Sequence, residues 1–407
     1  MVSLHEAVEF EALATERSGQ SRLGGTPRAN QIANGASSPL QEMMRQASSI
    51  RDAHWGETIT YSRKVFAPLT TMCRDTCGYC TFVKHPDDPG AYIMTPDEVL
   101  ATARKGEEVG CKELLFSLGE KPEQRYDKAA KALEMLGYAS MIDYLAAMCA
   151  LVLEETSLLP HVNAGTLTDD EIEKLKPVSA SMGMMLETVS NRLMQPGMPH
   201  HQCPDKTPKA RLRTLEVAGR NKVPFTTGLL IGIGETWAER VEALFAINAA
   251  HRRHGHIQEV IIQNFRAKPG IAMADHPEPP LDDMLLTLAT ARLVLDPSIS
   301  LQAPPNLSSR HAAYLDAGIN DWGGISPVTR DFINPERPWP QLDGLAEACV
   351  AKGLRLQERL TVYPAYLRTG GYVAPPVAAR AKAMARQDGL ALCQALEQEG
   401  EAAHAAA

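Results

Sequence analysis

The chain has 407 residues, of which 44% are hydrophobic and 22% are charged, and its formal net charge is −8. This composition is typical of a globular protein and excludes a wholly disordered chain, and eight Cys residues are too few for a disulfide-dense secreted module. An acidic chain also lacks the basic surface of a nucleic-acid-binding protein, so we expect no nucleic-acid partner.

The N-terminal segment has no continuous apolar run of the kind found in a signal peptide. The longest apolar runs, such as Leu145–Leu153, are about half as long as a membrane span requires. We therefore expect a cytoplasmic protein that does not bind membranes. Its thiols would be reduced, so that clustered cysteines indicate a metal site or catalysis rather than disulfides.

The chain is predicted to divide into three parts. Residues 1–57 are expected to form a short N-terminal helix and a flexible linker, because residues 18–39 are rich in Ser, Gly, Asn, Pro and Gln. Residues 58–370 are expected to form the main domain, and residues 371–407 an Ala-rich, helical C-terminal tail.

Short apolar runs alternate with amphipathic stretches through the main domain. Thr95, Thr168 and Thr236 are each followed by Glu three positions later, which is a helix-start pattern. Alternation repeated about eight times predicts an α/β fold, a TIM-type (β/α)8 barrel with N- and C-terminal helical extensions. The predicted strands are residues 64–70, 113–118, 160–163, 180–187, 225–232, 258–265, 299–303 and 319–322.

Three cysteines lie close together after the first predicted strand, at Cys73, Cys77 and Cys80. Three thiolates on one loop can bind three irons of a [4Fe–4S] cluster and leave the fourth iron open to a small molecule. A structural zinc site completed by His85 is the alternative. The other cysteines are isolated, although Cys203 beside His200 and His201 could form a second metal site; the isolated residues are Cys111, Cys149, Cys203, Cys349 and Cys393.

The C-x3-C-x2-C pattern, with Tyr79 just before the last Cys, resembles the signature of the radical S-adenosylmethionine (SAM) superfamily. The resemblance implies two cofactors, a [4Fe–4S] cluster held by Cys73, Cys77 and Cys80, and SAM bound to the open iron. It also implies the chemistry, in which reductive cleavage of SAM yields a 5′-deoxyadenosyl radical that abstracts a hydrogen atom from the substrate.

The SAM-binding residues that the resemblance implies lie at strand ends, where a parallel barrel carries its chemistry. Glu120 follows Gly119 in a variant of the superfamily's Gly-Gly-Glu motif that lacks the first Gly. The alternative interpretation is that Glu120 is a solvated residue of a turn. Glu187 would contact the ribose and Arg211 the SAM carboxylate, unless the two form a structural ion pair. The turn after the fifth strand would approach the adenine through Gly232, Gly234 and Glu235.

Segments between residues 60 and 370 resemble the superfamily's deazaflavin ring-closing synthases of factor 420 biosynthesis. They include Pro204–Lys206, Pro224–Gly228, Gln263–Gly270, Gln302–Leu307 and Asn320–Thr329. The implied substrate is a ribityl-uracil adduct that carries a hydroxybenzyl group. It is made by a partner radical SAM subunit and cyclised with loss of ammonia, and an electron donor is required. Five residues are predicted to bind the uracil and the ribityl chain, each with a loop hydrogen bond or surface charge as its alternative: Asn264, Arg266, Lys268, Asn306 and Asp321.

The residue that accepts a proton during cyclisation is left unassigned, with His161, His200, His201 and Tyr79 as unranked candidates. Trp322 is expected to fill the barrel core rather than stack on substrate. Two other functions stay open. One is the partner reaction, which joins tyrosine to 5-amino-6-ribitylaminouracil, and the other is a non-redox binding protein stabilised by zinc.

Overall fold

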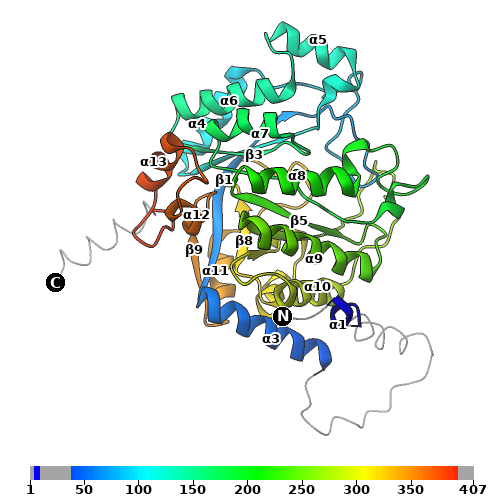
Figure 1. The fold of residues 1–407 in the computed structure, drawn as a ribbon, viewed down its shortest axis with the longest axis vertical. Helices are drawn as coiled ribbons and strands as arrows, with labels where there is room; N and C mark the ends of the chain where they lie inside the picture. Colours follow the sequence, from blue (N-terminus) through cyan, green and yellow to red (C-terminus); the bar gives the residue numbers. More distant parts are fainter. Residues whose placement is uncertain (1–3, 10–37, 393–407) are drawn as a thin grey trace, which may run out of the picture.

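The computed structural model describes residues 4–9 and 38–392, which form a closed barrel of eight parallel strands surrounded by helices (Figure 1). Strands β2 to β8 follow one another around the barrel in chain order, and β1 closes it by pairing with both β8 and β2. The predicted TIM-type barrel is therefore confirmed. The strands are β1 (Thr58–Thr70), β2 (Glu113–Leu118), β3 (Leu159–Asn163), β4 (Ser181–Gly183), β5 (Phe225–Ile231), β6 (Ile257–Asn264), β7 (Ser300–Gln302) and β8 (Asp321–Ile325).

All eight predicted strands are present, but three differ from the predicted extent by more than one residue at an end. β1 begins at Thr58 rather than at Lys64, and β8 begins at Asp321, two residues later than predicted. β4 ends at Gly183, although the apolar run continues to Glu187. The backbone of Glu187 is left-handed, with φ of 64°, which extended strands do not accommodate. This turn places the Glu187 side chain at the mouth of the barrel.

Helices cover the outside of the barrel and follow the predicted start signals. Thr95, Thr168 and Thr236 each cap a helix reciprocally with the Glu three positions later. The helices are α1 (Leu4–Glu9), α3 (Pro39–Trp55), α4 (Pro96–Glu108), α5 (Asp127–Met135), α6 (Met141–Glu155), α7 (Asp169–Leu175), α8 (Pro208–Arg220), α9 (Trp237–His254), α10 (Leu281–Val294), α11 (Leu342–Val350), α12 (Pro364–Arg368) and α13 (Pro375–Ala383). None of these helices combines the length and apolar composition of a membrane span.

The two predicted extensions contact the barrel where the structure describes them. α3 packs along α10, and α1 contacts α9, where Trp237 Nε1 donates a hydrogen bond of 3.0 Å to the carbonyl of Ala7 (Figure 1). α13 packs near β3. Most of the predicted linker and the end of the C-terminal tail, including Cys393, lie outside the described residues, so the three-part division stays a prediction.

The bottom of the barrel is closed by a segment that the sequence analysis did not predict. Strand β9 (Arg355–Glu358) pairs in parallel with the start of β1, and the chain then crosses beneath the barrel. There the buried Arg359 guanidinium lies 2.7 Å from Glu259 and also pairs with Asp321, and the Tyr363 hydroxyl is 3.0 Å from both carboxylates. This cluster supplies buried charges with partners and fixes the barrel floor.

The lower half of the barrel interior also holds buried polar groups from the first three strands. Lys64 and Glu113 form a buried ion pair of 2.7 Å. His161 Nδ1 is 2.7 Å from Ser181 Oγ, and burial lowers the pKa of His161 to about 4. The imidazole is therefore neutral at neutral pH.

We expect the protein to lose stability on acidification between pH 6.5 and pH 4, in part because of His161. Its folded pKa is depressed from 6.5 to about 4, so the unfolded chain binds more protons in this interval, and the contribution is complete above pH 6.5. Across the whole interval from pH 6.5 to pH 4, this pKa shift lowers the free energy of unfolding by about 3 kcal/mol. Urea unfolding at pH 7.5 and pH 5 measures it, with His161→Gln as the comparison. An equal pH dependence in both proteins would contradict the assignment.

Candidate active site

The three predicted cluster cysteines lie on the loop that follows β1, and all three line one cavity of about 270 Å³ at the mouth of the barrel. The loop is anchored on both sides. Gly78 N donates to Pro199 O at 2.8 Å, and Arg74 N donates to Glu120 O at 2.9 Å. Gly119 has to be glycine, because a Cβ there would lie 1.9 Å from the Met72 carbonyl oxygen. The close approach of this β2 loop therefore positions the cysteine loop.

The arrangement of the thiols fits an iron–sulfur cluster better than a single zinc ion. Among the described residues, the one group of metal-ligating atoms within 4.8 Å of one another is Asp75, Glu120 and Asp205, so the three sulfur atoms are more widely spread. Three thiolates on one zinc ion would lie roughly 3.8 Å apart. The fourth ligand of the zinc alternative, His85, is exposed and lies beside Asp87 at 3.5 Å instead of at the cavity.

The local environment of the cysteines favours a bound metal centre. Cys73 Sγ accepts hydrogen bonds from the backbone N–H groups of Asp75 at 3.4 Å and Glu120 at 3.1 Å, which stabilise a thiolate. Burial raises the pKa of Cys73 and Cys80, so an isolated thiolate is unfavourable at either position without a cation. Cys203, predicted to be isolated, instead hydrogen-bonds Cys77 and lowers the pKa of that thiol.

Three of the six predicted SAM-binding residues meet at this cavity. Glu120 is buried, accepts a hydrogen bond of 2.6 Å from Thr166 N and lies 3.7 Å from Arg211. Burial raises the pKa of Glu120 to about 7. Arg211, near the start of α8, donates to the carbonyls of Asp205 at 3.0 Å and of Met185. A carboxylate and a guanidinium therefore lie next to each other. This arrangement can bind the ammonium and the carboxylate group of an amino acid.

Glu187 lines the same cavity in a different polar cluster. Its carboxylate is 2.6 Å from Lys206 and 3.2 Å from His200, and it accepts a hydrogen bond from the Tyr79 hydroxyl. Burial opposes ionisation, but Lys206, Arg211 and His200 together hold the pKa of Glu187 well below its usual range. The closest carboxylate to Arg211 is Glu120, so the alternative of a direct Glu187–Arg211 contact pair is not what the structure contains.

The other three predicted SAM residues do not line the cavity. Gly232 and Gly234 have positive φ values of 85° and 104°, and the Glu235 carboxylate accepts hydrogen bonds of 2.9 Å from the N–H groups of Gly232 and Ile233. Glu235 also forms a 2.7 Å ion pair with Arg240. These residues build the turn between β5 and α9, and from this region Leu230 reaches the cavity instead.

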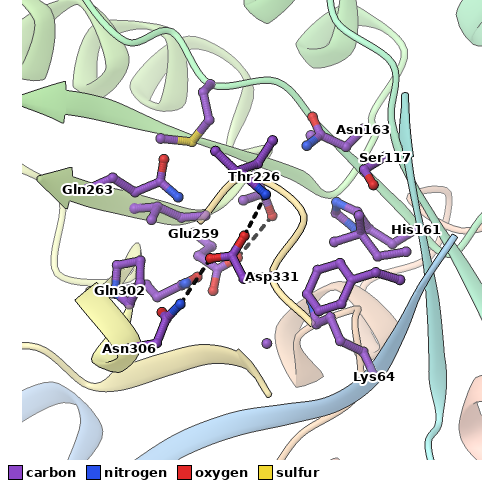
Figure 2. A pocket seen from close by; sticks show the side chains of 18 of the residues that line it. Lys64, Ser117, His161, Asn163, Thr226, Glu259, Gln263, Gln302, Asn306 and Asp331 are labelled. Atoms are coloured by element: carbon purple, nitrogen blue, oxygen red, sulfur yellow. Dashed lines mark hydrogen bonds between the residues drawn. The ribbon is translucent and has the colours of Figure 1, made fainter. Parts of the chain in front are cut away.

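A second cavity of about 180 Å³ fills the barrel interior below the first (Figure 2). The two cavities share eight lining residues and therefore adjoin each other between the cysteine loop and the barrel floor. The shared residues are Ser117, Asn163, Met184, Met185, Gln263, Leu307, Ile333 and Asn334. The loop after β8 covers this space, and Figure 2 shows Asp331 of that loop accepting a 2.9 Å hydrogen bond from Asn306.

Four of the five predicted substrate residues line this space. Asn264, Arg266 and Lys268 line the cysteine cavity, and Asn306 lines the barrel cavity. Asn264 Oδ1 and Arg266 Nε are buried without a hydrogen-bond partner, which is costly unless a ligand supplies one. Asp321 lines neither cavity. It is fully buried in the floor beside Arg359, because it begins β8 at the end of the barrel opposite to the cysteines.

The radical SAM superfamily profile matches residues 67–247. The chain is 51% identical over 315 residues to the 7,8-didemethyl-8-hydroxy-5-deazariboflavin synthase of Methanopyrus kandleri, an alignment that covers 77% of this chain and 94% of that protein. The chain belongs to the 7,8-didemethyl-8-hydroxy-5-deazariboflavin synthase family. Family membership within the radical SAM superfamily makes a [4Fe–4S] cluster and SAM its cofactors, and the thiol arrangement described above fits them.

Other relatives of this deazariboflavin synthase family member are longer or more distant. The chain is 51% identical over 358 residues to the FO synthase of Nocardia farcinica, and it spans 41% of the length of that protein. The solved structure of the FeFe-hydrogenase maturase HydG from Carboxydothermus hydrogenoformans matches with a TM-score of 0.64 at 17% identity, over 93% of this chain and 94% of that one. Methylornithine synthase (PylB) matches with a TM-score of 0.62 at 16% identity, over 87% and 97%. These two share the fold.

Some residues of this deazariboflavin synthase site were not predicted from the sequence. Lys206 and Asp75 line the cysteine cavity. Lys206 lies within the Pro204–Lys206 segment, and the likeness of this segment to the family was the sequence signal that could have identified Lys206 as a site residue. Arg359 and Thr361 line the barrel cavity from β9 onward, where no sequence signal was recognised. Trp322 is fully buried beside His311 and also lines the barrel cavity, so its expected role as a core residue stays a prediction.

The four candidates for the proton acceptor lie in different places. His161 lines the barrel cavity (Figure 2). Tyr79 lines the cysteine cavity, and its hydroxyl donates a hydrogen bond to Glu187. His200 Nε2 is 2.9 Å from the Tyr79 hydroxyl, and neither His200 nor His201 lines either cavity. These two histidines do not form a metal-ligating group with Cys203 among the described residues.

Replacement of Arg211 by Ala is expected to weaken SAM binding about tenfold or more while leaving iron content unchanged. The variant removes the guanidinium beside Glu120, and the hydrogen bonds of Arg211 go to the carbonyls of Asp205 and Met185 rather than to a cluster cysteine. A charge-assisted contact of this kind contributes about 1.5–3 kcal/mol. Equilibrium binding of SAM to the reconstituted protein measures the effect. Arg213→Ala is the matched control, because Arg213 is exposed on the same helix. Unchanged SAM affinity in Arg211→Ala would remove this residue from the site.

Proposed function

We propose that the protein closes the deazaflavin ring. As a radical SAM lyase, it would convert 5-amino-5-(4-hydroxybenzyl)-6-(D-ribitylimino)-5,6-dihydrouracil into 7,8-didemethyl-8-hydroxy-5-deazariboflavin with loss of ammonia. The observation that carries the proposal is a pair of adjoining cavities, one lined by the three cysteines and the other in the polar barrel interior. It occurs in a chain that is 51% identical to a synthase of this name over 94% of that protein's length.

In the proposed reaction each part of the cavity has its own task. Cys73, Cys77 and Cys80 would hold the cluster, and the bound cluster and SAM would together supply hydrogen-atom abstraction from the substrate. Glu120 would accept hydrogen bonds from the SAM ammonium group, and Arg211 would donate to its carboxylate. Glu187, held ionised by Lys206, would accept from the ribose hydroxyls.

The chain's own residues would also control water and protons during cyclisation. Ring closure joins the ribityl-bearing nitrogen to an aromatic carbon, breaks the C–H bond of that carbon and releases the 5-amino group as ammonia. The substrate would also be oxidised by two electrons: one hydrogen atom passes to the 5′-deoxyadenosyl radical, one electron to an electron acceptor such as the oxidised cluster, and one proton to the departing amine. The loop after β8 would exclude bulk water from this step, since Ile333 and Asn334 line both cavities. Asn264 and Arg266, each with an unpartnered buried atom, would contact the substrate next to SAM.

The proposal includes three further elements. A partner radical SAM subunit would make the adduct from tyrosine and 5-amino-6-ribitylaminouracil, and an electron donor would reduce the cluster. A cytoplasmic location would keep the cluster thiols reduced. The joining reaction itself and a zinc-stabilised binding protein are not favoured, because the alignment covers nearly all of a ring-closing synthase and the thiols are too widely spread for one zinc ion.

The test is anaerobic reconstitution of the cluster followed by incubation with SAM, a reductant and the purified adduct. We expect 5′-deoxyadenosine together with a fluorescent deazaflavin. Formation of 5′-deoxyadenosine without deazaflavin would retain radical SAM chemistry and overturn the substrate. If protein with a verified cluster formed neither of the two products, the proposed function would be overturned.

Arg266→Ala is expected to spare SAM cleavage and to lower the deazaflavin yield about tenfold. Arg266 pairs with Glu278 at 2.6 Å, and its buried Nε, which has no partner, is available to the substrate; a charge-assisted hydrogen bond contributes about 1.5–3 kcal/mol. Quantifying both products by chromatography separates the two effects. The exposed Arg310→Ala serves as control. A normal yield from Arg266→Ala would exclude a substrate contact.

A further inference from the structure

Three side-chain amides from three strands converge on the barrel cavity. Asn163 ends β3, Gln263 lies near the end of β6, and Gln302 ends β7 (Figure 2). None of these amides makes a side-chain hydrogen bond within the described residues. Ser117, which lines the same space, has a buried hydroxyl oxygen that also lacks a partner. A ring of unused hydrogen-bonding groups therefore surrounds the space between the two cavities.

A neighbouring amide, Gln258, shows that the barrel can satisfy such groups where it needs to. Gln258 donates to Thr361 O at 3.0 Å and accepts from Tyr363 N at 3.2 Å. Asn306 donates to Asp331 at 2.9 Å, but its own buried Oδ1 has no partner. Among the described residues, the sealed polar atoms that lack a partner do not include the amides of Asn163, Gln263 and Gln302, so these amides face the open cavity, where a ligand can reach them. Open amides at the three positions are consequently better explained by a ligand than by packing.

The charges around the cavity restrict the kind of ligand. Lys64 is paired with Glu113 at 2.7 Å, and Arg359 is paired with Glu259 at 2.7 Å and with Asp321. With these cations already neutralised, nothing in the barrel cavity favours a phosphate or carboxylate. What it offers is amide donors and acceptors, which match the alternating N–H and C=O groups of a pyrimidinedione and the hydroxyls of a sugar alcohol.

We propose that Asn163, Gln263 and Gln302 form a subsite for the uncharged uracil–ribityl part of the substrate, below SAM and away from Arg266 and Lys268. The proposal rests on the proposed function and deepens it. The apolar part of the wall, with Phe66, Met184 and Leu307, leaves room for the hydroxybenzyl ring. The amides would thus determine specificity for an unphosphorylated ribityl-uracil.

The test uses Gln302→Met and Gln263→Met, which keep the length of the side chain and remove its hydrogen bonds. The exposed Gln195→Met is the matched control. Binding of the fluorescent product, 7,8-didemethyl-8-hydroxy-5-deazariboflavin, and of 5-amino-6-ribitylaminouracil is measured for each reconstituted protein by fluorescence titration and calorimetry. We expect each amide variant to weaken binding of both ligands tenfold or more. We also expect wild type to bind 5-amino-6-ribitylaminouracil at least tenfold more tightly than its ribityl phosphate ester.

Iron content and thermal unfolding identify a variant that fails to fold. In that case Gln263→Met, at a partly buried position, replaces the variant of the buried Gln302 as the decisive variant. Affinities within twofold of wild type in both folded variants would overturn the subsite, as would equal or tighter binding of the phosphate ester. Failure of the proposed function gives a different result, because the wild-type protein would then form no deazaflavin from the adduct.

Discussion

Replacement of Cys77 by Ala is expected to remove the iron–sulfur cluster and all deazaflavin formation while the barrel stays folded. Cys77 is one of three thiols on the loop after β1, whereas the hydrophobic core lies between the strands and the outer helices. Two remaining thiolates cannot hold a cluster that needs three protein ligands. We expect iron content to fall from about four per chain to near zero, with loss of the broad absorbance near ~400 nm.

The control for this variant is Cys149→Ala, which removes a thiol that is buried in α6, distant from the cavity. Its iron content should equal that of wild type even if its stability falls. Circular dichroism of both variants verifies that the barrel is folded. Unaltered iron content in Cys77→Ala would contradict the ligand assignment.

Asp321→Ala is expected to destabilise the protein by about 3–5 kcal/mol, the cost of breaking a buried ion pair by removing one partner. Asp321 is fully buried and pairs with Arg359, which is also buried. Without Asp321 the Arg359 charge is left with Glu259 alone, and Thr60 and Tyr363 lose a hydrogen-bond acceptor. Urea unfolding of the apoprotein measures the change in the free energy of unfolding.

Asp316→Ala is the matched control. Asp316 pairs with Lys352 at 2.7 Å, but both side chains are more than 40% exposed, and such pairs contribute about 0–1 kcal/mol. If Asp321→Ala unfolded within 1 kcal/mol of wild type and instead lost affinity for the substrate, the structural role would be wrong. The substrate role predicted from the sequence would then be restored.

The architecture could be predicted from the sequence because each unit carries its own local signals. Apolar runs specify strands, and capping pairs such as Thr95 with Glu98 specify where the next helix begins. Eight such units leave few parallel arrangements besides a closed barrel. β9 was missed because its sequence, Arg-Leu-Gln-Glu, has no apolar run, and its pairing with β1 depends on the completed barrel.

The cavity residues that were placed correctly follow from the rule that chemistry lies at the carboxyl ends of strands. Glu120 follows β2, and Lys268 follows β6. Asp321 violates the rule because β8 begins two residues later than predicted, so a residue expected near the top of the strand lies at the bottom. An error of two residues in the predicted start of β8 was therefore enough to assign Asp321 to the wrong end of the barrel.

Glu235 illustrates a different difficulty. It follows β5 at the correct end of the barrel, but its carboxylate bonds the backbone N–H groups of its own turn and Arg240 of α9. A carboxylate that follows a strand can accept hydrogen bonds from the backbone of its own turn or from a bound ligand. Sequence spacing does not distinguish these two roles. Burial and hydrogen-bond partners do, as Glu120 shows by lining the cavity beside Arg211.

The most direct test of the ring-closing assignment is a comparison of two substrates on the same reconstituted protein. One sample receives SAM, reductant and the hydroxybenzyl adduct, and the other receives SAM, reductant, tyrosine and 5-amino-6-ribitylaminouracil. We predict deazaflavin from the first sample, and no consumption of tyrosine in the second. Consumption of tyrosine together with an untouched adduct would contradict the assignment and identify the protein as the adduct-forming enzyme.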